Sequence, residues 1–259
     1  MLLAIDIGNT ETTLGLFAGE RLEASWRLTT TPTRTPDEWA AALTAFLSQS
    51  GRSTQEVRAA IVASVVPQVT QEMCAGAAIA TTVQPAVVDG RARLPITLDV
   101  DEPLTVGADR IVNTLAAVHL FKRDTIVVDF GTATTFDCIT ADGRFIGGVI
   151  MPGLRTASDE LVRRTAKLPA TELVPPERVI GRRTEECIRA GVLWGTVDAV
   201  DGLVRRIRAE WPGGGRPQCV ATGGLAGLIA PHSREIESVH PDLTLVGLRI
   251  AAAALGLAW

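Results

Sequence analysis

The chain contains one stretch of sequence twice, and this repeat constrains its fold more than any other feature. Residues 5-IDIGNTETTLGLFAGERL-22 align without gaps with 128-VDFGTATTFDCITADGRF-145. Each copy predicts a strand, an Asp-x-Gly turn, a second strand, a tight turn and a third strand. Identical residues at matched positions include Asp6 and Asp129, Gly8 and Gly131, Thr12 and Thr135, and Arg21 and Arg144. Such internal similarity predicts a molecule made of two related halves.

After each copy the pattern changes to alternating helices and strands. Thr35, Pro36 and Glu38 form the signature of a capping box, which predicts a helix over 35–51. The remaining expected elements are a strand at 57–66, a helix after Pro67, a strand at 82–89, helices near 108–122, 154–167 and from Thr184 towards Trp211, a strand at 218–224, a short helix, a strand around 236–246 and a final alanine-rich helix. We therefore expect an α/β fold with halves at 1–121 and 122–259.

Composition and charge exclude several classes of protein. With 259 residues, 46% of them hydrophobic and 21% charged, the chain is typical of a globular enzyme. No apolar stretch is long enough to cross a membrane, and the start lacks the basic region of a signal peptide, so we expect a cytoplasmic protein. A net charge of −4 argues against nucleic acid as the main partner.

Several catalytic classes are excluded by the residues that are missing. Neither Lys122 nor Lys167 follows a glycine, so the chain has no Walker A loop. It also lacks the protein-kinase signatures and the G-x-S-x-G motif of a hydrolase. The three histidines have no catalytic spacing, and His119 is expected in the core or at an interface. The four isolated cysteines are expected to be reduced: Cys74, Cys138, Cys187 and Cys219.

The Asp-x-Gly turns are candidates for phosphate binding. A turn of this kind presents backbone N–H donors to an anion, while its aspartate favours cations. A single copy could also be an ordinary turn in which Asn9 and Thr10 satisfy their own backbone. The presence of a second copy, at 129–135, favours the binding function.

Two such halves resemble the superfamily of acetate and sugar kinases, actin and the Hsp70 ATPase. This resemblance implies duplicated ribonuclease H-like (actin-like ATPase) domains, each a mixed five-stranded sheet with flanking helices. The motifs 6-DIGNT-10, 107-GADR-110, 129-DFGTATTFD-137, 147-GGVIMPG-153 and 222-TGG-224 occur in the order seen in type III pantothenate kinase. Membership would imply ATP-dependent phosphorylation of pantothenate to 4′-phosphopantothenate, the first step of coenzyme A synthesis.

The resemblance also implies a set of nucleotide and cation contacts. Asp6 would help to hold Mg²⁺ through water, and Asp129 would bind K⁺ or NH₄⁺. Because the phosphate site has no lysine, the monovalent cation is a plausible replacement for positive charge there. The residues that match the family's ATP contacts are Asp6, Ile7, Gly8, Asn9, Thr10, Glu11, Thr12, Thr13, Thr132, Gly223 and Gly224.

The same resemblance implies substrate contacts from 107–110 and from Thr184. Asp109 matches the general base, Gly107 and Ala108 would leave room for substrate, and Arg110 offers a planar charged fork. Each has a simpler alternative: Asp109 could serve the helix dipole, Arg110 a surface salt bridge, and Thr184 a helix N-cap. The family is dimeric, and the helix Ile111–Phe121 is a candidate interface.

One departure from the family and two competing functions remain. Family members often carry a tyrosine before the G-x-D-R motif, whereas this chain has none, so an aromatic contact with pantothenate is not expected. Related proteins act as accessory factors in transcriptional activation, and other superfamily members phosphorylate sugars or acetate. The enzyme is favoured because all of its expected key residues are present: Asp6, Asp109, Arg110, Asp129 and Thr132.

Overall fold

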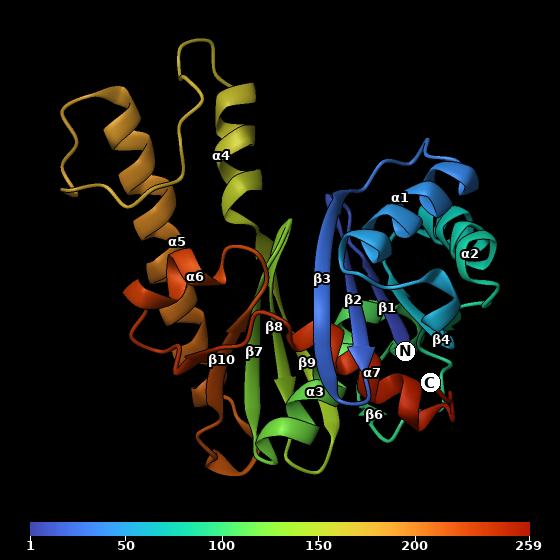
Figure 1. The fold of residues 1–259 in the computed structure, drawn as a ribbon. Helices are drawn as coiled ribbons and strands as arrows, with labels where there is room; N and C mark the ends of the chain where they lie inside the picture. Colours follow the sequence, from blue (N-terminus) through green and yellow to red (C-terminus); the bar gives the residue numbers. More distant parts are fainter. The chain divides into compact units, whose positions relative to one another are not determined.

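The computed structural model describes all residues from Met1 to Trp259 and contains two compact units. The first unit comprises Met1–Leu120 together with Leu243–Trp259, and the second comprises Phe121–Asp242. Both are drawn in Figure 1. The first break falls between Leu120 and Phe121, whereas the expected halves were 1–121 and 122–259, and the second unit ends at Asp242 because the C-terminal helix groups with the first unit.

The first unit is built on a mixed sheet whose strands lie in the order β3-β2-β1-β4-β5. The meander β1–β3 is antiparallel, whereas β4 and β5 run parallel to β1 because helical crossovers connect them. The strands are β1 (Leu2–Ile7), β2 (Glu11–Ala18), β3 (Arg21–Thr29), β4 (Ala59–Ser64) and β5 (Ala86–Val88), and the short β6 is Thr97–Leu98.

Helices cover both faces of this sheet. Alternate residues of a strand point to opposite faces, so Leu3 and Ile5 pack with helices α1 (Pro36–Gln49) and α2 (Pro67–Thr81). The other face of β1 packs with helices α3 (Ala108–Phe121) and α7 (Leu243–Ala254). The short 3₁₀ turns of this unit are Thr54–Glu56 and Pro103–Thr105.

The capping box predicted for the first helix is confirmed. Glu38 N donates to Thr35 Oγ1 at 3.4 Å, and Thr35 N donates to Glu38 Oε2 at 2.8 Å. Pro36 occupies the first helical position, where a missing N–H costs nothing. The spacing of Trp39, Leu43, Phe46 and Leu47 predicts one apolar face, and three of these residues are buried while Phe46 is half-buried.

The second unit repeats the architecture of the first. Its strands lie in the order β11-β10-β7-β8-β9, again with an antiparallel meander and parallel neighbours. One face packs with α5, whose buried residues include Leu193 and Val200. The elements are β7 (Thr125–Phe130), β8 (Ala133–Ile139), β9 (Arg144–Pro152), α4 (Leu154–Arg163), α5 (Thr184–Ala209), β10 (Gln218–Thr222), α6 (Ala226–Ile229) and β11 (Ser238–Val239), with 3₁₀ turns at Pro212–Gly214 and Ala230–His232. The predicted duplicated actin-like fold is thus confirmed.

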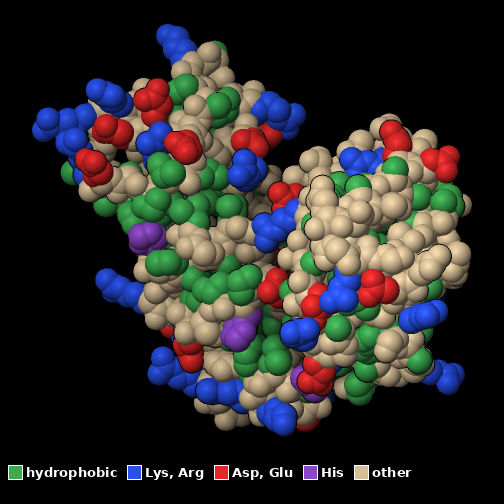
Figure 2. All heavy atoms as spheres, viewed as in Figure 1, with side chains coloured by type: hydrophobic (Ala, Val, Ile, Leu, Met, Phe, Trp, Pro, Cys, Tyr) green, Lys and Arg blue, Asp and Glu red, His purple; other side chains and the backbone are tan.

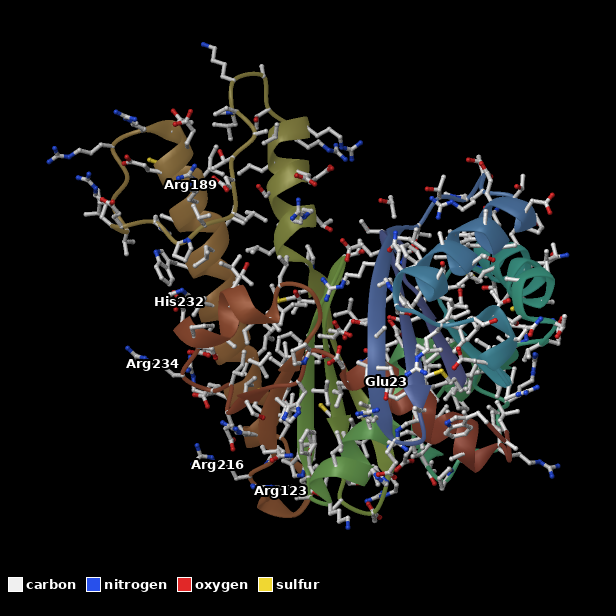
Figure 3. All side chains as sticks on the ribbon, viewed as in Figure 1. Glu23, Arg123, Arg189, Arg216, His232 and Arg234 are labelled. Atoms are coloured by element: carbon white, nitrogen blue, oxygen red, sulfur yellow. The ribbon has the colours of Figure 1, made fainter.

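Two local predictions were wrong. The strand expected around 236–246 is only the two-residue β11, because the chain enters α7 at Leu243 and buries Leu245 and Leu248 on the first unit's sheet. His119 was expected in the core or at an interface; it lies on the exposed side of α3, so the core placement was wrong and the interface stays a prediction. His232, by contrast, packs edge-on against the ring of Trp194 of α5, with centroids 5.0 Å apart (Figure 3).

The remaining observations agree with the sequence. All four cysteines are free thiols, and burial raises the pKa of Cys219 to about 12. A thiol with so high a pKa is chemically inert at neutral pH. None of the helices is long and apolar enough to cross a membrane.

Candidate active site

The two Asp-x-Gly turns join equivalent strand pairs but differ in length by one residue. In the first unit Ile7 pairs with Thr12, and Gly8 N donates to Glu11 O at 3.0 Å. In the second unit Phe130 pairs with Thr134, and Gly131 N donates to Ala133 O at 3.0 Å.

The strand register also corrects the gap-free alignment. Asp6 pairs with Thr13 across the first turn, and Asp129 pairs with Thr135 across the second. Thr13 is therefore the structural equivalent of Thr135, and the sequence match of Thr12 with Thr135 was wrong by one position. An alignment without gaps cannot detect a one-residue difference in loop length.

The first turn exposes only part of the predicted phosphate loop. The side chains of Ile7 and Thr12 are fully buried, so these two residues could meet a ligand only through their backbone. Asn9, Thr10 and Glu11 are exposed at the tip of the turn.

Thr30, which directly follows the third strand of the meander, stabilises the first turn through hydrogen bonds. Thr30 Oγ1 donates to Gly8 O at 2.7 Å, and the same hydroxyl shares a hydrogen bond with Thr12 Oγ1 at 2.9 Å. Thr30 N also donates to Thr10 O at 2.8 Å. Because Thr30 is only 7% exposed, these bonds are shielded from water and hold the turn closely.

Asp109 lies at the same edge of the first unit's sheet as this turn. Ala108, at the start of α3, is buried in the core on the sheet face that carries Asp6. Just before α3, a Cβ placed on Gly107 would lie 3.5 Å from Val65 Cγ1. Val65 N in turn donates to Ile7 O at 3.1 Å, directly before the turn. The first unit thus brings its Asp-x-Gly turn and 107-GADR-110 together.

The carboxylate of Asp109 folds back over the backbone in front of the helix. Arg110 N donates to Asp109 Oδ1 at 2.8 Å, as expected for an aspartate in a first helical turn. A Cβ on Gly107 would lie 2.4 Å from the same oxygen, so only glycine permits this position. The predicted space above Gly107 is therefore occupied by the carboxylate, and the methyl group of Ala108 is buried.

The environment of Asp109 changes its acidity. Burial raises the pKa of the Asp109 carboxyl above its usual value, and the hydrogen bond and positive charge of Arg110 oppose this rise. A raised pKa makes the ionised carboxylate a better proton acceptor, which is the property that a general base requires.

The second turn is braced by glycines. Gly153 N donates to Thr132 O at 3.1 Å, and a Cβ on Gly153 would lie 2.4 Å from Gly131 O and from Thr132 O. Thr156 Oγ1 donates to Thr132 O at 2.6 Å. The start of α4 therefore supports the backbone of the second turn.

Gly223 supports the same turn from its other side. Its φ of +88° belongs to the left-handed region, which favours glycine. A Cβ there would lie 2.4 Å from Asp129 Oδ1 and 2.7 Å from Phe130 N. The expected nucleotide contact at Gly223 and the expected cation ligand at Asp129 thus touch one another, while Gly224 is exposed beside them.

Both aspartates fit the cations that the family implies. Asp6 and Asp129 each lie half-buried on a central strand, next to the turn. The structure contains no group of three or more His, Cys, Asp or Glu side chains that could enclose a metal. This suits Mg²⁺, which keeps several waters and takes few protein ligands, and it suits a singly charged ion at Asp129.

Thr184 begins α5, but it does not cap the helix. The N-cap is Arg183, and no side chain satisfies the first N–H groups, so the N-cap interpretation of Thr184 was wrong. Its side chain is exposed and lines a pocket of about 590 Å³ between α4, α5 and the end of β9. Most of the lining is apolar, and it includes Leu161 and Ile188.

Sequence reasoning missed the residues that fasten the turns. Thr30 and Gly153 lie far from the turns in sequence. Neither a threonine after a strand nor a G-x-x-x-P-G sequence indicates which residue it will contact in the folded chain. Gly153 is the last residue of the family motif 147-GGVIMPG-153, so the motif indicated that this glycine matters but not that it packs against the second turn.

Comparison with known proteins identifies the family of the chain. The family model described as type III pantothenate kinase matches residues 2–206. The type III pantothenate kinase of Moorella thermoacetica is 44% identical, covering 96% of this chain and 98% of that protein. That of Thermomicrobium roseum is 46% identical, covering 97% and 96%.

Solved structures with low sequence identity support the fold. A putative Baf family transcriptional activator from Campylobacter jejuni has a TM-score of 0.60 at 17% identity, covering 97% of both chains. The activator of a 2-hydroxyisocaproyl-CoA dehydratase from Clostridium difficile, solved with ADPNP, has a TM-score of 0.58 at 14% identity, covering 99% of this chain and 93% of that one. With the family model and the near-full-length relatives, the chain belongs to the type III pantothenate kinase family.

Proposed function

We propose that this protein transfers the γ-phosphate of ATP to the terminal hydroxyl of pantothenate. The product is 4′-phosphopantothenate, and the reaction is the first step of coenzyme A synthesis. The observation that carries the proposal is the position of Asp109, a carboxylate with a raised pKa at the same sheet edge as an Asp-x-Gly turn, in a chain of this family.

Asp109 is the proposed general base. The hydroxyl oxygen of pantothenate attacks the γ-phosphorus, the bond from that phosphorus to the β,γ-bridging oxygen breaks, and ADP leaves with the bond's electrons. Asp109 accepts the hydroxyl proton. Its contribution is smaller than that of positioning and charge neutralisation, because phosphoryl transfer requires little covalent help from the protein.

The turns position ATP. Backbone N–H groups of the first turn, from Gly8 to Glu11, are proposed to face the phosphates, and Thr132 makes a further contact from the second turn. Gly223 and Gly224 let the adenosine approach the backbone closely, because they have no side chains.

Cations would complete the charge balance. Asp6 would hold Mg²⁺ through water, and Asp129 would hold K⁺ or NH₄⁺. When bound, these ions neutralise the negative charge of the phosphates, which a lysine does in P-loop proteins. The protein's part is to fix the two carboxylates beside the turns.

Pantothenate is proposed to contact Arg110 and Thr184. The guanidinium of Arg110 is permanently charged and its planar donors match a carboxylate. Because the chain has no tyrosine, the family's tyrosine contact with pantothenate is absent, and other groups would set the affinity.

A second copy of the chain is the proposed partner. The inner face of α3, the predicted interface, is buried in the first unit's core, which leaves only the end of that helix, with Leu120, exposed. The second unit exposes more large apolar side chains, near the α4–α5 pocket. Its exposed side chains include Leu161, Val179 and Ile180. Figure 2 shows basic and acidic side chains interspersed around hydrophobic ones at this end of the unit.

A substrate panel tests the proposed function. ADP release is measured with ATP, Mg²⁺ and K⁺ in the presence of pantothenate, acetate or a set of hexoses. We expect release that depends on pantothenate alone. Release with a hexose or acetate would instead support a sugar or acetate kinase, and no release with any acceptor would support a non-catalytic accessory protein.

A further inference from the structure

The two central aspartates have different neighbours on one side. Adjacent residues in register on neighbouring strands project from the same sheet face. Asp6 is flanked in this way by Thr13 and Ala63, whereas Asp129 is flanked by Thr135 and Thr222. The two units therefore match on one side of the aspartate and differ on the other, where alanine is replaced by threonine.

Thr222 is an unusual residue for its position. Its side chain is 1% exposed, and its Oγ1 is buried without a hydrogen-bond partner. Buried hydroxyls normally find a partner, so an orphaned one indicates either a cost to stability or an absent ligand. Ala63, at the equivalent place, is fully buried and carries no polar atom that would need one.

The surroundings of Thr222 point to an ion. Side chains in register on neighbouring strands have Cβ atoms about 4.5–5.5 Å apart, close enough for the Thr222 hydroxyl and the Asp129 carboxylate to contact one ion. Directly after Thr222, the backbone of Gly223 lies against Asp129 Oδ1, since a Cβ there would be 2.4 Å from that oxygen. The β10 strand end and the carboxylate are thus fixed beside one another.

The donor set suits a single positive charge. Beside Thr222 it consists of the Asp129 carboxylate and neutral hydroxyls; the next acidic side chain on this sheet face is the buried Asp137, two residues beyond Thr135 on β8, and no cluster of three metal-binding side chains exists in the structure. Divalent ions usually attract more negative charge than this when a protein encloses them. A monovalent ion needs less charge and accepts neutral oxygens.

We propose that Thr222 Oγ1 is a ligand of the monovalent cation beside Asp129, and that this hydroxyl makes the second unit, but not the first, a monovalent-cation site. The inference rests on the proposed function, which places K⁺ or NH₄⁺ at Asp129. It adds a ligand that comes from another strand and explains why only one copy of the repeat would select such an ion.

Three variants of the full chain test this proposal. Thr222→Val removes the hydroxyl and keeps the shape, while Thr222→Ser keeps the hydroxyl. Thr134→Val is the matched control, because Thr134 Oγ1 is also buried without a partner, but on the opposite face of the same sheet. The readouts are the melting temperature without nucleotide in KCl and in NaCl, and the K⁺ concentration that gives half-maximal activation.

We expect wild type and Thr134→Val to be stabilised by K⁺ relative to Na⁺. Thr222→Val should lose this difference and need at least about tenfold more K⁺, the scale on which metal sites respond to the loss of a supporting group. Thr222→Ser should lie closer to wild type than to Thr222→Val. A folded Thr222→Val with wild-type K⁺ dependence would overturn the proposal.

Hydrogen exchange on wild type keeps the test valid if Thr222→Val does not fold. K⁺ should slow amide exchange at Gly223 and Leu225 relative to Na⁺, and equal exchange would overturn the proposal. Failure of the proposed function can be distinguished from failure of the ion site. K⁺-specific stabilisation without pantothenate phosphorylation would support the ion site and reject the kinase. Equal phosphorylation in K⁺ and Na⁺ without K⁺-specific stabilisation would support the kinase and reject the ion site.

Discussion

The first turn is held by a buried hydroxyl, whereas the second is held by close glycine packing together with an exposed hydroxyl, that of Thr156. In the first unit Thr30 bonds to Gly8 O and to Thr12 from beneath the turn. In the second, the backbones of Gly153 and Gly223 lie so close to the turn that neither could carry a side chain in place. Two copies of one motif thus reach similar loops through different packing.

The difference shows how a repeat can acquire separate functions. The hydrogen bonds of Thr30 hold the first turn without filling the space around it with close backbone contacts. In the first unit, Asp109 lies at the same end of the sheet as this turn. Close glycine packing leaves little space around the second turn, and what lies beside it is a carboxylate with a neighbouring hydroxyl. Under the proposed function, the first copy would serve phosphate binding and proton transfer, and the second would serve the cation and the nucleotide.

The largest expected effect comes from removing the base in the first unit. Asp109→Asn should lower kcat by about 10²–10⁴, the usual contribution of general-base catalysis, with ATP binding retained. Asp37→Asn is the matched control, because Asp37 also lies in a first helical turn but outside the proposed site. Steady-state kinetics and an ATP titration measure both effects, and an unchanged kcat would remove Asp109 from the mechanism.

The next effect comes from adding one methyl group beside the second turn. Gly223→Ala must leave its positive φ and move away from Asp129, at a cost of about 1–3 kcal/mol or more. We expect a lower melting temperature and weaker ATP binding. Gly227→Ala in α6, where a Cβ would touch nothing, should change neither. Normal ATP affinity in Gly223→Ala would show that the second turn does not depend on this packing.

A pH profile examines the first unit without a mutation. The base must be ionised, and burial raises the pKa of Asp109, so activity should fall on the acidic side at a pH above the ordinary aspartate range of about 3.9. Because the pKa of Asp109 is higher in the folded than in the unfolded chain, protonation of Asp109 stabilises the fold. This stabilisation is complete below the pKa of Asp109 in the unfolded chain and is lost as the pH rises through its pKa in the folded chain. Asp109→Asn should therefore be at least as stable as wild type at pH 7, and a lower melting temperature would contradict this.

The smallest effects compare the two hydroxyls that fasten the turns. Thr30→Val removes a buried hydroxyl that serves Gly8 O and Thr12, and should cost about 1–2 kcal/mol of unfolding free energy. Thr156→Val removes an exposed hydroxyl that donates to Thr132 O, and should cost about 0.5–1 kcal/mol of unfolding free energy. Urea denaturation measures both. A larger loss at Thr156 would reverse the contrast between the turns.

The repeat, the helix caps and the order of motifs were sufficient to predict the fold, because they are local signals. The capping box at Thr35 involves residues three apart, and both Asp-x-Gly turns lie within single hairpins. The unit boundary at the C-terminus depends instead on where α7 packs, and Gly247 fits against Val112 O only in the folded chain.

The site could be predicted only in part for the same reason. Asp109 was found through its motif, but its burial and its contact with Gly107 require the folded backbone. The ungapped alignment could not reveal that the two turns differ in length. Nor could it pair Thr222 with Asp129, since these residues lie on different strands and meet only through sheet register.

One measurement tests the central claim most directly: mass spectrometry of a reaction of the purified protein with ATP, pantothenate, Mg²⁺ and K⁺. The account predicts 4′-phosphopantothenate formed in equal amount with ADP, and neither product above background from Asp109→Asn. ADP without phosphorylated pantothenate, or equal product from Asp109→Asn, would contradict it.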